Sequence, residues 1–425
     1  MAAFPKIKGG SLPVLFIKLA LRNLARHRNR TFVTSTIIAL AIFLFILMDS
    51  LIGGMTDMSY ATLIDYEFGH LQIVNRSYWH EKEKLPLKNL LPWETVNHPA
   101  VRNISGLKGA SPELEFLGRL NNGINELPVV GKGIIPNDFY KVYPLADQFV
   151  EGAEFALGEH KAVLGKRLAE LLKLDIGDYI TILVKDKNET FNTIDAEVAG
   201  LVHTINPNVN SNYVYLPLDV VQQALAVDES ISRLIIRLDE KDLAHKASRD
   251  LQGEFSQNND QIGVYPWHEI EAVSVADAKN AGIRVMLGVI LLIAAIAIIN
   301  NVILAALERM PEIGMMKAMG LEEKEIVYVF VTEATGIGVL GGFSGVILGA
   351  LGVGVFRRVG VDFTTMMDLD MAQWGIPVLG KIYGSWSPIT LVQGFIFAAS
   401  ASFLASILPA YWAARKDPIQ AIYRR

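Results

Sequence analysis

Residues 285–320 read VMLGVILLIAAIAIINNVILAALERMPEIGMMKAMG, and this stretch decides the fold. No charged residue occurs from Val285 to Leu307. About 20 apolar residues are enough for a helix to cross the hydrocarbon core of a bilayer. A short segment with charges towards both ends, and with Pro311 and Gly314 inside it, follows from Glu308 to Gly320. We therefore predict a membrane helix that ends in a short docking element at the point where it leaves the membrane.

The chain contains three further stretches that are long and apolar enough to cross a bilayer. Thr31 to Met48 and Ile382 to Ala414 carry no charge, and Ile326 to Phe356 carries one acid, Glu333. The apolar residues, which make up 51% of the chain, are therefore concentrated in particular segments. Together with the first stretch, these segments predict an α-helical membrane protein with four transmembrane helices.

Basic residues at the ends of these spans predict how the chain is oriented. Several lysines and arginines precede the first span, and no Asp or Glu occurs before Asp49. Arg415 and Lys416 follow the last span, and the sequence ends in Arg424 and Arg425. Because cytoplasmic flanks carry an excess of Lys and Arg, both termini are expected in the cytoplasm. We interpret the first span as a retained helix, because its apolar run is long and no small-x-small cleavage site follows it.

This orientation places residues 53–282 outside the cytoplasm. The segment is long enough to fold around a core of its own. Short apolar runs typical of strands alternate with helical segments and turns, which favours an α+β fold. Residues 272–282 contain no turn residue before Gly282, so we expect a stalk helix that continues into the second span. The predicted strands are Leu71–Val74, Val129–Gly131, Lys161–Leu164, Tyr179–Val184, Glu197–Ala199, Tyr213–Tyr215 and Arg233–Leu238, and the predicted helices are Lys166–Leu172, Pro217–Leu225 and Asp239–Phe255.

The predicted fold is a membrane α-helical protein with four transmembrane helices and a large α+β extracytoplasmic domain between helices 1 and 2. A basic amphipathic helix comes first, with Ile17, Leu21 and Leu24 on one face. Such a helix suits the headgroup region of a bilayer. The predicted boundaries are 1–30 for this helix, 31–52 for the first span, 53–282 for the external domain with its stalk helices, 283–307 for the second span, 308–325 for a cytoplasmic coupling segment, 326–356 for the third span, 357–387 for an external loop, 388–412 for the fourth span and 413–425 for a cytoplasmic tail.

A glycine-rich motif lies in the third span. Residues 336–341, GIGVLG, match the dinucleotide fingerprint G-x-G-x-x-G. That fingerprint requires a preceding strand, a tight turn and the start of a helix, whereas this sequence lies inside an apolar span. Small residues four positions apart allow membrane helices to approach one another closely. We therefore predict transmembrane packing at Gly338, Gly341, Gly342, Gly345 and Gly349.

Glu333 is the one acid well within a span. An ionisable side chain at membrane depth is costly and marks a functional hypothesis. We expect this intramembrane acid to have a structural or coupling role, either near the inner headgroups or paired with Arg309 or Lys317. A proton relay is the less favoured alternative.

Composition and motifs exclude several functions for this chain. It has no Cys, so disulfides, thiol catalysis and Cys-ligated zinc are excluded. The eight histidines show no H-E-x-x-H or other ligand spacing, which predicts no metal site. No G-x-x-x-x-G-K-[ST] loop occurs, so we expect no cofactor in this chain and ATP bound by another polypeptide. The net charge of −5 does not indicate a nucleic-acid partner.

Six segments, taken in order, resemble the FtsX-like, or MacB-type, family of ABC transporter permeases. The large external domain is more similar to that of the lipoprotein-releasing transmembrane subunits and macrolide exporters than to the small domain of the cell-division members. The six segments are LALRNLARHRNRT at 19–31, AVLGKRLAELLKLDIGDYITI at 162–182, YVYLPLDVVQQAL at 213–225, ERMPEIGMMKAMG at 308–320, TEATGIGVLGGFSGVILG at 332–349 and LPAYWAARKDPIQAI at 408–422.

The resemblance implies a multi-pass subunit of the bacterial inner membrane that works with other chains. Two permease chains, identical or different, would pair among the membrane lipids. Each would contact one of two copies of an ABC ATP-binding subunit, which holds ATP and Mg. Closure of those subunits would be transmitted through the stalk helices to the external domains, and lipoprotein or another amphiphile would leave the outer leaflet. The resemblance places the ATPase contact at Glu308, Arg309, Glu312, Ile313, Gly314 and Lys317, where charged side chains can form charge-assisted hydrogen bonds.

Two questions stay open at this point. Carrier-recruiting relatives have a long Pro-containing hairpin after the GD turn, whereas the connection from Tyr179 to Gly200 is short and lacks Pro. A periplasmic carrier or outer-membrane partner is therefore undecided. The alternative function is a permease that regulates a cell-wall hydrolase or senses a peptide without transport, while no catalytic constellation supports a membrane-bound enzyme. A transporter should have an apolar vestibule between the spans, which we expect to be lined by Phe43, Leu47, Met286 and Ile290.

Overall fold

The computed structural model of the chain describes residues 22, 24, 26, 28–258, 261–362 and 381–415. The chain divides into two compact units. Unit 1 comprises Met1–Thr56, Lys279–Val361 and Lys381–Arg425, and unit 2 comprises Asp57–Ala278 and Asp362–Gly380. Most of the predicted N-terminal amphipathic helix, residues 363–380 of the predicted external loop and residues 416–425 of the predicted tail lie outside the described residues.

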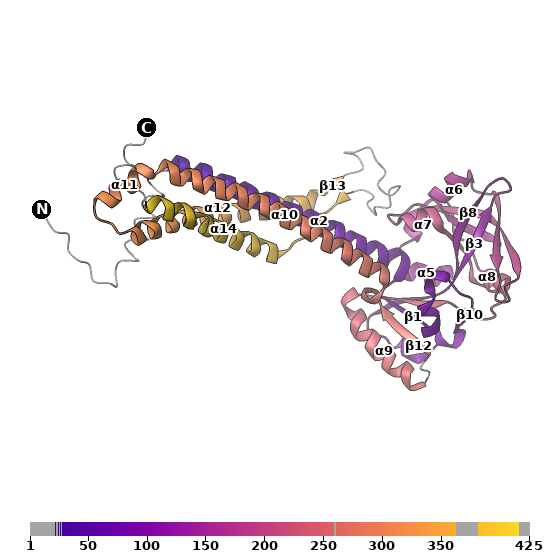
Figure 1. The fold of residues 1–425 in the computed structure, drawn as a ribbon. Coiled ribbons are helices and arrows are strands. Elements are labelled where there is room, and N and C mark those ends of the chain that lie inside the picture. Colours follow the sequence, from indigo (N-terminus) through magenta and orange to yellow (C-terminus); the bar gives the residue numbers. More distant parts are fainter. Residues whose placement is uncertain are drawn as a thin grey trace. The chain divides into compact units, whose positions relative to one another are not determined.

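Unit 1 is built from long apolar helices. They are α2 (Arg28–Leu63), α10 (Glu271–Glu308), α12 (Glu323–Val359) and α14 (Pro388–Ala414), with the short helix α11 (Met310–Ala318) between α10 and α12. Each of the four contains a segment long and apolar enough to cross a membrane, which confirms the four predicted transmembrane helices (Figure 1). The predicted stalk helix is also confirmed, because α10 runs without interruption from Glu271 into the second span.

One row of glycines on α12 packs against α14. A Cβ atom at Gly338 would meet Ser402 and the carbonyl of Ala398, and one at Gly342 would meet the side chain of Ala398. Ser402 and Ala398 are themselves fully buried. The two helix backbones are therefore as close as the predicted small-residue spacing allows.

A second row of glycines on α12 faces α2 instead. Cβ atoms at Gly341, Gly345 and Gly349 would meet Ile38, Ile42 and Ile46 respectively. These isoleucines are buried in the core of unit 1. The row therefore has the four-residue spacing of one helix face, and α12 uses its two glycine rows against two different neighbours.

Unit 2 contains a ten-stranded mixed sheet in the order β12-β1-β11-β3-β4-β9-β6-β8-β5, with β7 paired to both β3 and β8. A separate pair is formed by β2 (Leu91–Pro92) and β10 (Ser230–Ile231), and β13 (Val361–Asp362) and β14 (Lys381–Ile382) lie between α12 and α14 in the chain. The sheet strands are β1 (Leu71–Asn75), β3 (Leu107–Asn121), β4 (Glu126–Ile134), β5 (Phe149–Gly152), β6 (Lys161–Gly165), β7 (Tyr179–Lys185), β8 (Phe191–Val202), β9 (Tyr213–Pro217), β11 (Arg233–Leu238) and β12 (Ile262–Pro266).

Successive residues of a strand point to opposite faces, so this sheet has a core on each face. In β11, Leu234 and Ile236 belong to the larger core, and Ile235 belongs to the smaller one. The other strands and the helices of unit 2 supply the remaining residues of these two cores. The helices of unit 2 are the π-helix η1 (Ile64–Phe68), α3 (Arg76–His80), α4 (Pro99–Arg102), α5 (Pro136–Val142), α6 (Lys166–Leu172), α7 (Pro207–Asn212), α8 (Leu218–Leu225) and α9 (Ala244–Asn258), with 3-10 turns between some of them (Figure 1).

The structure confirms several predicted strands and corrects others. The predicted strands in β1, β6 and β7 are present with almost the same ends. The predicted strand Glu197–Ala199 is wrong in length, because it is only part of the longer strand β8. The missed signal is alternation, since Ile194, Ala196 and Val198 are buried while the residues between them are exposed or half-buried. The predicted helix from Asp239 begins only at Ala244, after a 3-10 turn.

Candidate functional site

The helix α11 has a sequence that favours its short length and sharp boundaries. Pro311 stands in its first turn, where the missing N–H costs no intrahelical hydrogen bond. Glu312 in the first turn and Lys317 in the last turn match the helix dipole. The next helix, α12, begins with a capping box in which Glu322 and Glu325 satisfy each other's backbone N–H groups. The chain from α10 to α12 therefore makes a defined pair of turns around α11.

One side of α11 is buried against unit 1. Met310, Ile313 and Gly314 are buried. Met310 and Ile313 belong to a cluster with Ile326 and Phe330 of α12 and with alanines near the C-terminal end of α14. Burial of such apolar side chains contributes roughly 25 cal/mol per Å² of area removed from water. The cluster therefore attaches α11 to two membrane helices.

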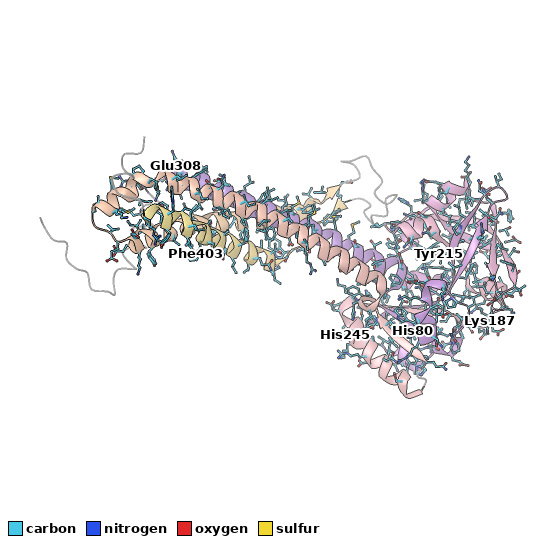
Figure 2. All side chains as sticks on the ribbon, in the orientation of Figure 1. His80, Lys187, Tyr215, His245, Glu308 and Phe403 are labelled. Atoms are coloured by element: carbon cyan, nitrogen blue, oxygen red, sulfur yellow. The ribbon has the colours of Figure 1, made fainter. Side chains whose placement is uncertain are left out.

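The opposite side of α11 is open. The side chain of Met315 is 52% exposed, and that of Met319, directly after α11, is 69% exposed. Glu308 at the end of α10, labelled in Figure 2, is also exposed. The carboxylate of Glu312 is 41% exposed. The predicted contact residues thus divide into two groups, because Glu308 and Glu312 reach the surface while Ile313 and Gly314 do not.

Lys317 attaches the end of α11 to both of its neighbours. Its Nζ lies 3.2 Å from Oε1 of Glu323 and donates a hydrogen bond of 2.9 Å to the carbonyl of Ala414. That carbonyl belongs to the last turn of α14, where carbonyl groups lack an intrahelical partner. The lysine therefore satisfies a helix end while it holds α11 in place.

Glu333 forms the centre of a buried charge group, which we call the membrane cluster and define as Arg30, Arg309 and Glu333. Oε2 of Glu333 pairs with Nη1 of Arg309, and Oε1 lies 3.4 Å from Nη2 of Arg30. The side chains of Glu333 and Arg309 are only 5% and 4% exposed. The predicted pair of Glu333 with Arg309 is confirmed, whereas Lys317, the other predicted partner, pairs with Glu323.

Arg30 is the member of the membrane cluster that sequence reasoning missed. It stands directly before the first span and reads there as one of many basic residues at a membrane edge. The pair joins residues 303 positions apart, so no local pattern reports it. The sequence offered one signal for Arg30, namely that it is among the basic residues nearest the apolar run. A long cationic side chain at such a position can reach an acid inside a membrane span.

The membrane cluster as defined contains two cations and one anion, and Glu312 Oε2 lies 3.9 Å from Nε of Arg309 as a second, partly exposed anion. Nε and Nη2 of Arg309 and Nε of Arg30 are buried without a hydrogen-bond acceptor among the described residues. A neighbouring cavity of about 20 Å³ has room for roughly one water molecule. The Glu333 carboxylate thus connects α2, the turn between α10 and α11, and α12. Removing one partner of such a buried pair costs about 3–5 kcal/mol.

The four predicted vestibule residues lie in different surroundings. Phe43 and Leu47 of α2 lie against Gly352 of α12. Ile290 of α10 packs against the core of unit 1, and Met286 is 65% exposed. Within the part of the chain that the structure describes, no group of three or more His, Cys, Asp or Glu side chains is placed to hold a metal ion.

Two family models match the chain. Residues 31–254 match the MacB-like periplasmic core domain, and residues 284–418 match the FtsX-like permease C-terminal domain. The first match covers more than half of the chain and contains the whole ten-stranded sheet except β12. The second contains α11, α12 and α14, and with them Arg309 and Glu333 of the membrane cluster.

Similar curated proteins include lipoprotein-releasing and macrolide-export proteins. The chain is 24% identical over 323 residues to the lipoprotein-releasing system transmembrane protein LolC of Xylella fastidiosa, which covers 74% of this chain and 77% of that protein. It is also 24% identical over 432 residues to the macrolide export ATP-binding/permease protein MacB 2 of Aeromonas hydrophila, which covers 96% of this chain and 60% of that protein. The chain thus spans most of the first relative and about three fifths of the second.

A solved structure of the periplasmic region of MacB from Actinobacillus actinomycetemcomitans is 14% identical to this chain. The match covers 50% of this chain and 92% of that one, with a TM-score of 0.34. A score this low carries no argument about the fold, so the assignment rests on the two family models.

Proposed function

The chain belongs to the MacB-type, FtsX-like family of ABC transporter permeases, and on this premise we propose that it couples ATP hydrolysis in a separate chain to movement of an external domain. One observation carries the proposal. The short helix α11 has an exposed side, while Arg309 and Lys317 connect its two ends to three long helices. A push on α11 would therefore reach the membrane helices through ion pairs and a packed core.

The exposed side of α11 is our proposed contact with the ATP-binding subunit. Glu308 and Glu312 supply charge at this surface, and Met315 and Met319 supply flexible apolar side chains that adapt to a partner. Ile313 and Gly314 act from the buried side, where they hold α11 against α12 and α14. The proposed partner binds ATP and Mg, and two copies of it would serve two permease chains.

We propose that α10 lines the contact with a second permease chain, whether identical or different. Apolar side chains that are half or more exposed recur along it at spacings typical of one helix face. Met286 belongs to this set, so we propose a vestibule between two chains rather than within one. The set is Val285, Met286, Val289, Leu292, Ile293 and Ile296.

The proposed cargo is a lipoprotein or another amphiphile that is extracted from the outer leaflet of a bacterial inner membrane. Two features support this proposal: LolC is among the relatives, and apolar side chains are exposed along the spans. In this arrangement both termini and α11 lie in the cytoplasm, and unit 2 lies outside, as the basic flanks predict. A periplasmic carrier or an outer-membrane component would receive the cargo.

The absence of Cys from the whole sequence allows a direct test of the proposed contact. Glu312→Cys introduces a single thiol on the exposed side of α11. Lys381→Cys introduces one at the exposed first residue of β14, which precedes α14 in the chain, as the matched control. After thiol crosslinking in native membranes, mild-detergent purification and mass spectrometry should recover an ATP-binding subunit from the first variant and not from the second.

The retained material also distinguishes the proposed cargo from other roles. Acylated proteins or lipid-like molecules retained with the ATP-binding subunit support extraction. A cell-wall hydrolase without cargo would instead favour a permease that transmits a signal. If no ATP-binding subunit is recovered, even after crosslinking at position 312, the proposed coupling function is wrong.

A further inference from the structure

Unit 2 contains a pocket of about 490 Å³ that none of the functions proposed above uses. Its volume is within the range of about 300–1,000 Å³ that is common for small-molecule sites. One face of the sheet forms its floor, through Gln72, Glu115, Tyr213 and Arg233. Its walls come from η1, α3 and the segment that follows α3. The pocket therefore lies entirely within unit 2.

Strand register fixes a group of buried charges at the floor, which we call the strand cluster and define as Glu113, Glu115, Lys132 and Arg233. Arg233 of β11 lies directly opposite Glu113 of β3, and Glu115 lies opposite Lys132 of β4. The Arg233 guanidinium is 2.9 Å from Glu113 and 2.6 Å from Glu115, and Lys132 Nζ is 3.3 Å from Glu115. Opposite charges at such cross-strand positions stabilise the pairing.

The charges of the strand cluster balance one another. Burial alone would raise the pKa of Glu115, but Arg233 and Lys132 hold that pKa below its ordinary value. Two carboxylates and two cations therefore leave this group neutral. Any further buried charge beside the pocket has to be compensated from elsewhere.

Glu67 is such a further charge. It lies in the π-helix η1, is only 6% exposed and lines the pocket. Its Oε1 accepts hydrogen bonds of 2.6 Å from Asn206 and 3.0 Å from Asn208, which are neutral amides. No lysine or arginine among the described residues forms an ion pair with its carboxylate, and no described donor reaches Oε2. The pocket therefore has one negative charge without a cation.

Two features concern the position of Glu67 beside this pocket. A π-helix is rare and occurs frequently at functional sites, where it changes the direction of a side chain. Burial raises the pKa of the pocket residue Tyr213, and the negative charge of Glu67 raises it further. Glu67 and Tyr213 both line the pocket.

The rest of the lining suits an apolar body that carries a cation. Tyr213 already holds Lys132 Nζ 4.1 Å from its ring centre, and Trp79 holds Lys82 Nζ at 4.0 Å. These lysines therefore already occupy one face of each ring, and Tyr265 stacks on Trp79 with ring centres 4.0 Å apart. Apolar side chains complete the walls, and they are Phe68, Val74, Leu85, Leu117, Val130 and Ile270.

We propose that this pocket binds a small organic cation, an amine or quaternary ammonium group attached to an apolar body. The Glu67 carboxylate is the counter-ion, and the apolar walls bury the remainder of the molecule. The pocket selects against anions because the strand cluster is neutral, Lys82 and Glu83 in the lining offset each other, and Glu67 adds one negative charge. This site is independent of the proposed ATP-driven coupling.

The test uses the full chain in lipid nanodiscs without any ATP-binding subunit, so that its outcome does not depend on the coupling function. The probe is benzyltrimethylammonium, and its uncharged carbon isostere neopentylbenzene reports non-specific partitioning. Isothermal titration calorimetry should show saturable binding of the cation only. The variant Glu67→Gln keeps an oxygen acceptor for Asn206 and Asn208 and should weaken binding at least about tenfold, or about 1.4 kcal/mol.

Two further variants keep the test interpretable. Glu83→Gln removes an exposed carboxylate from the pocket rim and should change the dissociation constant by less than about twofold. Leu117→Lys places a cation in the wall at a side chain that is 55% exposed, so it should fold normally and compete with the probe. Equal binding of the cation and the isostere, no saturable binding to the wild type, or unchanged affinity in both Glu67→Gln and Leu117→Lys would overturn the proposal.

Discussion

The strand cluster and the membrane cluster, two buried charge groups among the described residues, are held together in different ways. The strand cluster lies on neighbouring strands, where backbone pairing sets the distance between Arg233 and Glu113 before any side chain is ordered. The membrane cluster lies at a junction of separate helices, where only side-chain contacts keep Arg309 beside Glu333. Buried partners balance the charges of the strand cluster, whereas the membrane cluster is balanced only with Glu312, a further ion-pair partner of Arg309 whose side chain is 41% exposed. Strand register therefore makes the strand cluster a rigid group. The helix junction makes the membrane cluster a group whose members can separate.

The largest expected effect is the loss of the arginine at the centre of the strand cluster. Arg233→Met leaves the buried carboxylates of Glu113 and Glu115 with one cation, Lys132, which pairs with Glu115. We expect the free energy of unfolding to fall by about 3–5 kcal/mol, because an uncompensated buried charge remains. Thermal unfolding of the full chain in nanodiscs measures this.

The control for Arg233→Met is Arg119→Met on the same face of β3. Arg119 pairs with Glu126, but its side chain is 59% exposed. An exposed ion pair contributes less than about 1 kcal/mol. If the two variants unfold at similar temperatures, the strand cluster is not the rigid group described above.

A smaller effect is expected in the membrane cluster. Glu333→Gln leaves Arg309 and Arg30 facing each other, but the Arg30 side chain is 23% exposed and can turn towards water. We therefore expect a loss of about 2–3 kcal/mol, below the usual cost of breaking a buried pair. The reversed pair Arg309→Glu with Glu333→Arg should recover most of this loss, and ATPase stimulation in the complex should recover with it.

The readout that separates a coupling role from a structural one is that ATPase stimulation. A purely structural pair would change the unfolding temperature in Glu333→Gln while stimulation of the surviving folded complex stayed at the wild-type level. Failure of the reversed pair to restore either quantity would show that the three charges do not act together.

The glycine rows of α12 give a matched pair of substitutions outside both clusters. A Cβ at Gly341 would meet Ile38 and the carbonyl of Ser35, whereas nothing lies within 4 Å of a Cβ at Gly354. Gly341→Ala should destabilise unit 1 by about 1–3 kcal/mol through overpacking. Gly354→Ala should be neutral or stabilise it by up to about 1 kcal/mol, because Ala is the better helix former.

Equal unfolding temperatures for the two alanine variants would contradict the close approach of α12 and α2. A rise in both would show that helix propensity, rather than packing, dominates along α12. The comparison needs no partner chain and uses the same measurement as the charge variants.

The last prediction concerns how the stability of unit 2 depends on pH. Burial lowers the pKa of His70 from 6.5 to about 4, and its Nδ1 accepts the backbone N–H of Leu238. The unfolded chain therefore binds more protons than the folded chain between about pH 6.5 and 4. Stability should be fully present above pH 6.5 and should fall as the pH drops towards 4, by about 1–3 kcal/mol.

This prediction is checked by measuring, in two variants, how steeply the unfolding temperature changes with pH. His70→Gln should flatten the dependence of the unfolding temperature on pH between 6.5 and 4. His245→Gln, at an exposed position on α9, should leave the wild-type slope in place. A wild-type slope in both variants would assign the pH dependence to other groups.

Part of the candidate site could be predicted from local patterns. The charges towards both ends of the ERMPEIGMMKAMG segment, directly after an apolar span, indicated a short docking element, and the only acid between Ile326 and Phe356 indicated Glu333. The division of α11 into a buried side and an exposed side could not be predicted. Its short sequence is apolar on more than one side, so only the packing of Ile313 against α12 and α14 decides which side is open.

The sequence by itself determined the number of membrane spans, the position of the external domain and many of its strands. These features depend on the hydrophobicity of residues that are neighbours in the sequence. Whether such a stretch enters a bilayer or forms one face of a sheet can therefore be read from a local window. Only the tertiary structure decided which charges meet. Glu333 pairs with Arg30 across 303 positions, Arg233 with Glu113 across 120, and Glu67 with Asn206 across 139. Strand register and helix packing set these distances, and a pattern in a local window contains neither.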